Sequence, residues 1–252
     1  MRCCGRGILL ALAVLGSAFP LGVAHAQQQD RPRLVLNTQG PGGATFAVGF
    51  SPDSQRIYAA GVDKVAHVWT LHGEPGRNER AALVNTLRWE IARGYRGVIH
   101  AMAPSPTTEQ VAVAGSSARD PGGDIVLFDA AGGTIERVLH GHAVTVISLA
   151  WSTDGKQLVS VDTGGEIRVW SAPNWRSMQL HPPGGPGETP ETYRPAMFLG
   201  DRIVAAAQRR EGPPQQWQIV LYDTARGGAK WRTLEETHQD HITALARTPA
   251  GG

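Results

Sequence analysis

Two stretches of this chain align with each other without a gap. Residues 46–69 read FAVGFSPDSQRIYAAGVDKVAHVW, and residues 147–170 read ISLAWSTDGKQLVSVDTGGEIRVW. The alignment matches Trp69 with Trp170 and places a polar, turn-forming segment at the same two positions in each copy. Short apolar runs separated by such turns are typical of consecutive antiparallel strands. This repeat constrains the fold strongly, because a repeated unit that cannot bury its own apolar faces must pack against its neighbours.

Weaker copies of the unit occupy most of the remaining chain. One runs over residues 99–129, with Phe128 at the Trp position, and another over residues 197–223, with Tyr222 at that position. A fifth copy begins at His238, where HQDHITALARTPAGG repeats the start of the third copy. The period is about fifty residues with four strands per unit. We therefore predict an all-β fold, a β-propeller of four-stranded antiparallel blades with about four blades and the first strand of a fifth.

The repeat resembles the WD-repeat family of β-propellers. In that family a Gly-His pair precedes the innermost strand of a blade and a Trp ends its third strand. The third copy carries this signature best, with Gly141 and His142 before the first strand and Trp170 at the end of the third. The resemblance covers residues 33–252 and implies a ring of seven blades in the complete protein. The resemblance is to exported, bacterial members of the WD-repeat family.

The resemblance implies a buried hydrogen-bond network in each blade. In the family, the His, a Ser or Thr of the second strand, an Asp of the next turn and the Trp form this network. His142, Ser160 and Trp170 match in the third copy, but Gly164 stands at the Asp position. Either the network is broken there, or Asp162 substitutes.

No other copy is complete. The first copy has Asp63 and Trp69, but Pro41 stands where the His is expected and Ala59 where the Ser is expected. His238 would be the blade histidine of the fifth copy. All of these positions are interpreted as structural rather than catalytic.

The N-terminus has the pattern of a secretory signal peptide. Arg2 and Arg6 precede an apolar run over residues 7–23, and the small-x-small site Ala24-His25-Ala26 follows. The alternative is a membrane anchor, but the run is shorter than the roughly 20 residues of a spanning helix. We predict cleavage after Ala26, an exported (periplasmic or secreted) protein, a linker at 27–32 and a propeller at 33–252.

Removing the signal changes the composition of the mature chain. Both cysteines, Cys3 and Cys4, lie in the signal, so core packing rather than disulfides must stabilise the mature domain. The full chain has 24 basic and 22 acidic residues, and the signal removes two arginines and no acid. The balanced charge that remains argues against a nucleic-acid partner. No later segment is long and apolar enough to span a membrane.

A search for catalytic and metal-binding motifs favours a non-enzymatic chain. The sequence contains neither G-x-S-x-G nor H-E-x-x-H. His238, Asp240 and His241 are residue types that bind metals, as are His140 and His142, but zinc needs three or four ligands in fixed geometry. Structural roles in the blades explain them better, so we predict no cofactor, no metal and no catalytic residue.

The leading hypothesis is a non-catalytic scaffold that binds a protein or peptide partner. Loops at the mouth of a propeller channel are common docking sites, and Tyr95, Arg96, Val144 and Asp240 follow the dipeptide position and would face that rim. The charged stretch at 73–81 is expected to be a loop between strands. The alternative is the targeting or regulatory propeller of a larger enzyme, for example protease-like, with its catalytic domain beyond residue 252. We expect the chain to be the front part of a longer protein, or else to close by self-association.

Overall fold

The computed structural model describes residues 42–74, 77–89, 94–117, 122–183, 195–209 and 216–246, which form four separate sheets. Blade 1 contains β1 (Thr45–Phe50), β2 (Arg56–Gly61), β3 (Val65–Glu74) and β4 (Arg77–Arg88). Blade 2 contains β5 (Ile99–Pro104), β6 (Gln110–Gly115), β7 (Gly123–Asp129) and β8 (Thr134–His142). Blade 3 contains β9 (Val146–Trp151), β10 (Gln157–Asp162), β11 (Ile167–Ser171) and β12 (Arg176–His181). Blade 4 contains β13 (Ala196–Leu199), β14 (Ile203–Arg209), β15 (Trp217–Asp223) and β16 (Ala229–His238), with a short 3-10 helix, η1 (Thr224–Arg226), before β16.

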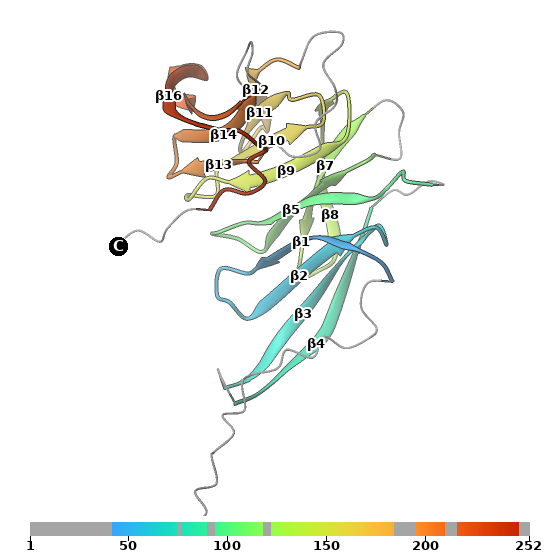
Figure 1. Cartoon of the computed structure of the whole chain (residues 1–252). Helices are drawn as coiled ribbons and strands as arrows, with labels where there is room; N and C mark the ends of the chain where they lie inside the picture. Colours follow the sequence, from blue (N-terminus) through green and yellow to red (C-terminus); the bar gives the residue numbers. More distant parts are fainter. Residues whose placement is uncertain are drawn as a thin grey trace, which may run out of the picture. The chain divides into compact units, whose positions relative to one another are not determined.

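Each sheet is antiparallel, and its strands are ordered as they follow in the chain. The inner strands β1, β5, β9 and β13 lie next to one another in that order, so consecutive blades are neighbours (Figure 1). The predicted all-β class and four-stranded antiparallel blades are confirmed, as a partial β-propeller. The predicted signal at 1–26 and linker at 27–32 lie outside the described residues.

The turn between the first and second strands is built from side-chain hydrogen bonds. In blade 3 the Ser152 hydroxyl donates to Asp154 Oδ1 at 2.7 Å and accepts from the Gln157 backbone N–H at 2.9 Å. Gly155 adopts a left-handed conformation with φ of 69°, which glycine reaches without a steric penalty. In blade 1, Ser51 likewise accepts from the Arg56 N–H at 2.9 Å. Ser and Asp at this spacing therefore reverse the chain without unpaired backbone donors.

Strand register places the four aromatic residues of the repeat at one equivalent position. Each lies opposite the same residue of the second strand: Trp69 opposite Ile57, Phe128 opposite Val111, Trp170 opposite Leu158, and Tyr222 opposite Val204. We call the sheet face that carries these aromatic residues the front face of the blade, and the other face its back face. Alternation along each strand then assigns every core residue to one face.

The core lies between blades, where a front face packs on the back face of the preceding blade. Phe128 and Val111 of blade 2 cluster with Tyr58 and Val68 of blade 1. The same arrangement recurs between blades 2 and 3 and between blades 3 and 4, with Trp170 and Tyr222 as the large front-face residues. Because the strands are buried on both faces, β6 and β10 are nearly continuous apolar runs.

Two expectations from the sequence are wrong. Residues 73–81 do not form a loop, because β3 extends to Glu74 and β4 begins at Arg77, with His72 paired to Arg80 across the hairpin. Charged residues are tolerated in these strands because this end of the hairpin is exposed, as at His72 and Arg80. The first strand of a fifth blade is also not formed over the described residues 239–246, where no described strand pairs with them.

In the described part of the chain, no helix has the length and apolar character needed to cross a membrane.

Candidate functional site

The best-formed polar cluster is buried where blade 2 meets blade 3. His142, at the end of β8, lies 3.0 Å from Asp162 Oδ2 through Nδ1 and 2.7 Å from the Ser160 hydroxyl through Nε2. Trp170 Nε1 lies 2.8 Å from the same hydroxyl. The sequence left open whether Asp162 substitutes for the missing Asp, and the structure places its carboxylate at the histidine. His142 belongs to the sheet of blade 2, so the cluster joins two blades.

The chemistry of the donors orders the protons in this cluster. An indole N–H can only donate, so the Ser160 oxygen accepts from Trp170. The Ser160 hydroxyl proton is then free to donate to His142 Nε2, which leaves the ring proton on Nδ1, directed at Asp162. Asp162 Oδ1 in turn accepts the Glu166 backbone N–H at 2.9 Å. Every polar group in the chain of hydrogen bonds is paired, which is what a buried network requires.

Glu166 brings a second carboxylate to the same histidine. Its Oε2 lies 3.3 Å from His142 Nδ1, while its Oε1 accepts from Gln179 and lies 2.7 Å from the Arg168 guanidinium. The Glu166 side chain is 5% exposed and that of Asp162 is 1% exposed. Arg168 thus supplies the positive charge that a buried carboxylate needs. The sequence analysis missed Glu166, because no motif marks its position.

The group of His142, Asp162 and Glu166 also has the residue types of a metal site, since one ligand atom of each lies within 4.8 Å of the others. Two observations favour hydrogen bonding instead. The Nδ1 proton that a metal would displace already faces Asp162 Oδ2, and Glu166 is paired with a guanidinium. The cluster is therefore explained as a hydrogen-bond network that joins blades 2 and 3, and we call it the clamp.

Blade 1 builds a different cluster. His67 of β3 lies 2.8 Å from Asp63 through Nε2, and its ring lies 5.5 Å from the Trp69 ring. Because Ala59 replaces the serine, neither Trp69 Nε1 nor His67 Nδ1 has a hydrogen-bonding partner among the described protein atoms. Ala59 lies directly opposite His67 in the sheet, so a hydroxyl at position 59 would lie near both groups.

Blades 2 and 4 differ again at the position of Asp162. Gly115 occupies it in blade 2, where an added Cβ would overlap the Val98 carbonyl oxygen. In blade 4 the position holds Gln208, which is buried and donates to the Tyr222 hydroxyl at 2.6 Å. Burial raises the pKa of Tyr222, so the phenol stays protonated in neutral solution. Phe128 has no polar atom and packs in an apolar cluster.

The predicted rim residues lie at one end of the sheets. Tyr95 and Arg96 precede β5, Val144 precedes β9 and Asp240 follows β16. At this end, in blades 1 to 3, the turn after the second strand is hydrogen-bonded to the segment that enters the first, as in the bond from Gly97 N–H to the Ser116 carbonyl. All four residues are exposed, with Tyr95 at 85% and the Asp240 side chain at 95%.

Phe46 and His100 extend the exposed surface at this end and were missed in the sequence. Phe46 is 51% exposed, and its ring stacks on His100 with centroids 5.3 Å apart and planes 7° apart. Desolvation lowers the pKa of His100 below its usual value, so the imidazole is neutral at pH 7. The pair is a flat aromatic surface at the start of the two inner strands.

The segment after β16 does not gather its histidines into a metal site. The His241 ring lies tilted against Trp217, with centroids 4.8 Å and planes 38° apart, and lies 2.9 Å from Asp240, whose pKa it lowers by hydrogen bonding. His238 lies exposed at the end of β16.

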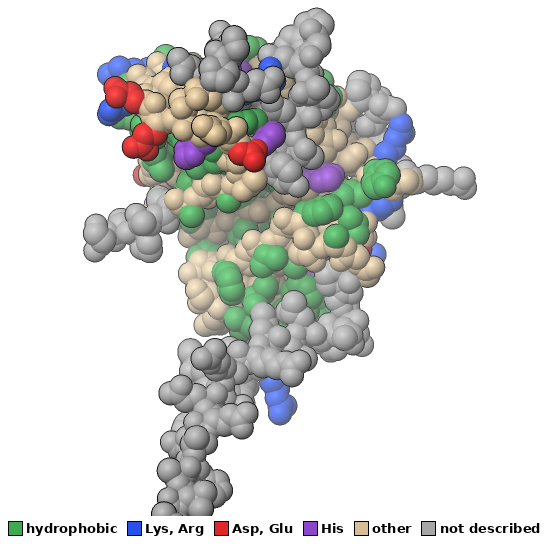
Figure 2. All heavy atoms as spheres, viewed as in Figure 1, with side chains coloured by type: hydrophobic (Ala, Val, Ile, Leu, Met, Phe, Trp, Pro, Cys, Tyr) green, Lys and Arg blue, Asp and Glu red, His purple; other side chains and the backbone are tan. Residues whose placement is uncertain are grey.

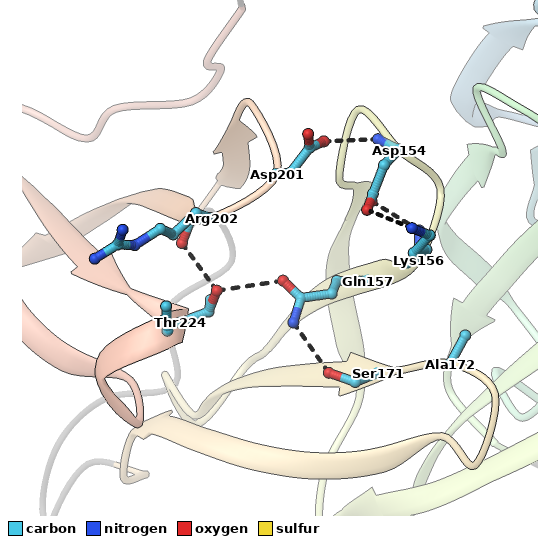
Figure 3. Close-up of a pocket in the computed structure, with 9 residues that line it drawn as sticks. Asp154, Lys156, Gln157, Ser171, Ala172, Asp201, Arg202 and Thr224 are labelled. Atoms are coloured by element: carbon cyan, nitrogen blue, oxygen red, sulfur yellow. Dashed lines mark hydrogen bonds and ion pairs between the residues drawn. The ribbon is translucent and has the colours of Figure 1, made fainter.

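A pocket of about 390 Å³ lies between blades 3 and 4 at the opposite end of the sheets. The Gln157 amide donates to Ser171 at 3.1 Å and accepts from Thr224 at 3.3 Å, and the Asp154 N–H donates to Asp201 at 2.7 Å (Figure 3). The bonds to Thr224 and Asp201 join blade 3 to blade 4, whereas the bond between Gln157 and Ser171 lies within blade 3. The pocket is best described as a polar gap between blades 3 and 4, across which the turns of the two blades are hydrogen-bonded.

The family model for the WD domain, G-beta repeat, matches residues 33–70 and 133–171. These two segments of the chain are therefore similar to WD40 repeats. The second match runs from the start of β8 to the end of β11. It therefore contains the three residues His142, Ser160 and Trp170, which are connected through the Ser160 hydroxyl.

Curated relatives and a solved structure agree with WD repeats. Coronin-7 of Rattus norvegicus is 30% identical over 232 residues, covering 89% of this chain and 23% of the relative. Transcription initiation factor TFIID subunit 5 of Caenorhabditis elegans is 25% identical over 160 residues, covering 52% of this chain and 24% of the relative. The chain thus spans about a quarter of the length of these relatives. The structure of U3-55K superposes with a TM-score of 0.56 over 77% of this chain and 52% of that chain, at 17% identity. Together these findings support a WD-repeat propeller.

Proposed function

We propose that this chain is an exported scaffold that binds a protein or peptide at the end of the blades where the WD-repeat inner strands begin. The observation that carries the proposal is the presence of WD repeats together with exposed apolar and aromatic side chains at that end. Tyr95 is 85% exposed, Phe46 51% and Val144 41%. Exposed aromatic residues contribute most to binding energy in protein interfaces.

The described chemistry supports binding more than catalysis. The polar groups of the network formed by His142, Ser160, Trp170 and Asp162 are paired with one another, and hydrogen bonds join blades 3 and 4 at the pocket between them. That the chain is not an enzyme and does not bind nucleic acid are predictions from the sequence.

The experiment is an affinity capture with matched surface variants. The chain would be immobilised and exposed to the envelope and secreted fractions of its source cells, and bound proteins would be identified by mass spectrometry. A specific partner should be lost with the double variant Tyr95→Ser and Val144→Ser. It should be retained with Lys156→Ser, whose side chain is 76% exposed at the opposite end of the sheets. A partner that binds both variants equally would contradict the proposed surface.

Export is part of the same proposal and is tested separately. The support is the basic, apolar and small-x-small order of residues 2–26, which lie outside the described residues. The N-terminal residue of the protein recovered from cells should be Gln27. Recovery of an intact N-terminus from the cytoplasmic fraction would refute export without affecting the binding surface.

A further inference from the structure

Blade 1 buries three polar atoms that have no hydrogen-bonding partner among the described protein atoms. They are Trp69 Nε1, His67 Nδ1 and Asp63 Oδ1. Hydrophobic side chains gather at the surface of the blade around β1 (Figure 2), but Trp69 of the same blade is fully buried and His67 is only 8% exposed. A buried polar group without a partner costs about 1–3 kcal/mol, so these atoms are expected to have one.

The corresponding position of blade 3 shows which group is replaced. Ser160 there accepts from Trp170 Nε1 at 2.8 Å and lies 2.7 Å from His142 Nε2. The register of β2 with β3 places Ala59 where the register of β10 with β11 places Ser160. Blade 1 therefore keeps an indole donor and an imidazole at this place but has no hydroxyl oxygen to join them.

The two unpaired nitrogens of blade 1 lie on either side of the Ala59 methyl group. Ala59 lies directly opposite His67 in the sheet, and Trp69 follows His67 by two residues on the same face of β3. The rings of His67 and Trp69 are 5.5 Å apart. Alanine is smaller than Ser160, and His67 is smaller than Arg168, which lies opposite Ser160 in blade 3. These smaller side chains leave space beside the methyl group, within an apolar cluster of buried residues.

The donors and acceptors around this space match a water molecule. Trp69 Nε1 carries a proton and can only donate. His67 Nε2 lies 2.8 Å from Asp63 Oδ2, so the carboxylate holds the ring proton on that nitrogen and leaves a lone pair on Nδ1. A metal ion cannot accept a hydrogen bond from an indole N–H, and an anion such as chloride has no proton to give to Nδ1. A water molecule can do both.

We propose that blade 1 binds one buried water molecule beside Ala59, between Trp69 Nε1 and His67 Nδ1. The water takes the place of the serine hydroxyl, because it accepts from the indole and donates to the imidazole. Its second proton is available to Asp63, whose Oδ1 is the third unpaired atom. Buried waters typically make about three hydrogen bonds, which is the number that these residues offer. The proposal does not depend on the binding function proposed above.

Crystal structures of the wild type and of two serine variants, at a resolution that shows single waters, test the proposal. The wild type should have one water within about 3.2 Å of both Trp69 Nε1 and His67 Nδ1. Ala59→Ser should lose this water entirely, because the new hydroxyl takes over its hydrogen bonds. Ala82→Ser is the matched control, since Ala82 lies exposed on β4 of the same blade and its substitution should leave the water in place.

Each outcome decides the proposal. A dry site in the wild type would overturn it, as would a direct hydrogen bond from His67 Nδ1 to another protein group. A water that persists in Ala59→Ser, or that disappears in Ala82→Ser, would also overturn it, because the water would then not be bound beside Ala59. Density that fits an ion or a larger molecule would contradict the assignment to water.

Discussion

The substitution Ser160→Ala tests the polar cluster of blade 3 directly. The serine hydroxyl accepts from Trp170 Nε1 at 2.8 Å and lies 2.7 Å from His142 Nε2, and the residue is fully buried. Its removal leaves one buried donor and one buried acceptor without a partner. Each unsatisfied group costs about 1–3 kcal/mol, so we expect the free energy of unfolding to fall by about 2–6 kcal/mol.

Urea denaturation followed by tryptophan fluorescence would measure this change. Hydrogen exchange of the Trp170 indole proton gives a local readout, which should accelerate in the variant because its acceptor is gone. Thr134→Ala is the control, since Thr134 lies exposed at the start of β8, away from this cluster, and should change stability by less than about 0.5 kcal/mol. A loss in Ser160→Ala no larger than that of the control, with unchanged indole exchange, would refute the reasoning.

Three further predictions concern other blades. Ala59→Ser should raise the free energy of unfolding by about 1 kcal/mol in urea melts, because the new hydroxyl can accept from Trp69 Nε1, which lacks a protein partner. The Arg202 guanidinium lowers the pKa of Asp223, so their pairing stabilises the protein above about pH 4 and is lost as the pH falls through the lowered pKa. Asp223→Asn should therefore show a shallower loss of thermal stability on acidification than the wild type. Gly115→Ala should lower the melting temperature and cost about 2–3 kcal/mol, because the added methyl group would overlap a backbone carbonyl of the neighbouring strand.

The sequence predicted those parts of the fold that depend on local repetition. Ser160 and Trp170 could be assigned because strand alternation and turn spacing fix which residues face the same side. Asp162 stayed ambiguous because the family pattern places the acid in the turn, where this chain has Gly164. In the structure Asp162 ends β10 two residues after Ser160, on the same face of the strand, and so reaches the same histidine.

Other features arise from side-chain contacts that no sequence motif marks. His67 lies on the third strand of its blade, where no motif places a histidine, yet it meets Asp63 at 2.8 Å. Gln208 reaches the Tyr222 hydroxyl from the position that Asp162 holds in blade 3. The exposure of Val48 was likewise not predictable, since its local sequence resembles that of buried inner strands and only the arrangement of blades leaves it uncovered.

The clamp of blade 3 has a consequence for how such a chain can be duplicated or redesigned. His142 sits on β8, which is hydrogen-bonded into the sheet of blade 2, whereas its partners Ser160 and Asp162 sit on β10. A gene segment cut at the sheet boundary, between β8 and β9, would carry the serine and lose the histidine. A segment that starts with β8 keeps the clamp intact but divides a sheet between two copies. The repeat unit that keeps the hydrogen-bond network therefore starts one strand earlier than the unit that folds as a sheet. Each added copy of that repeat unit contributes its first strand to the sheet of the preceding blade, which joins the two blades.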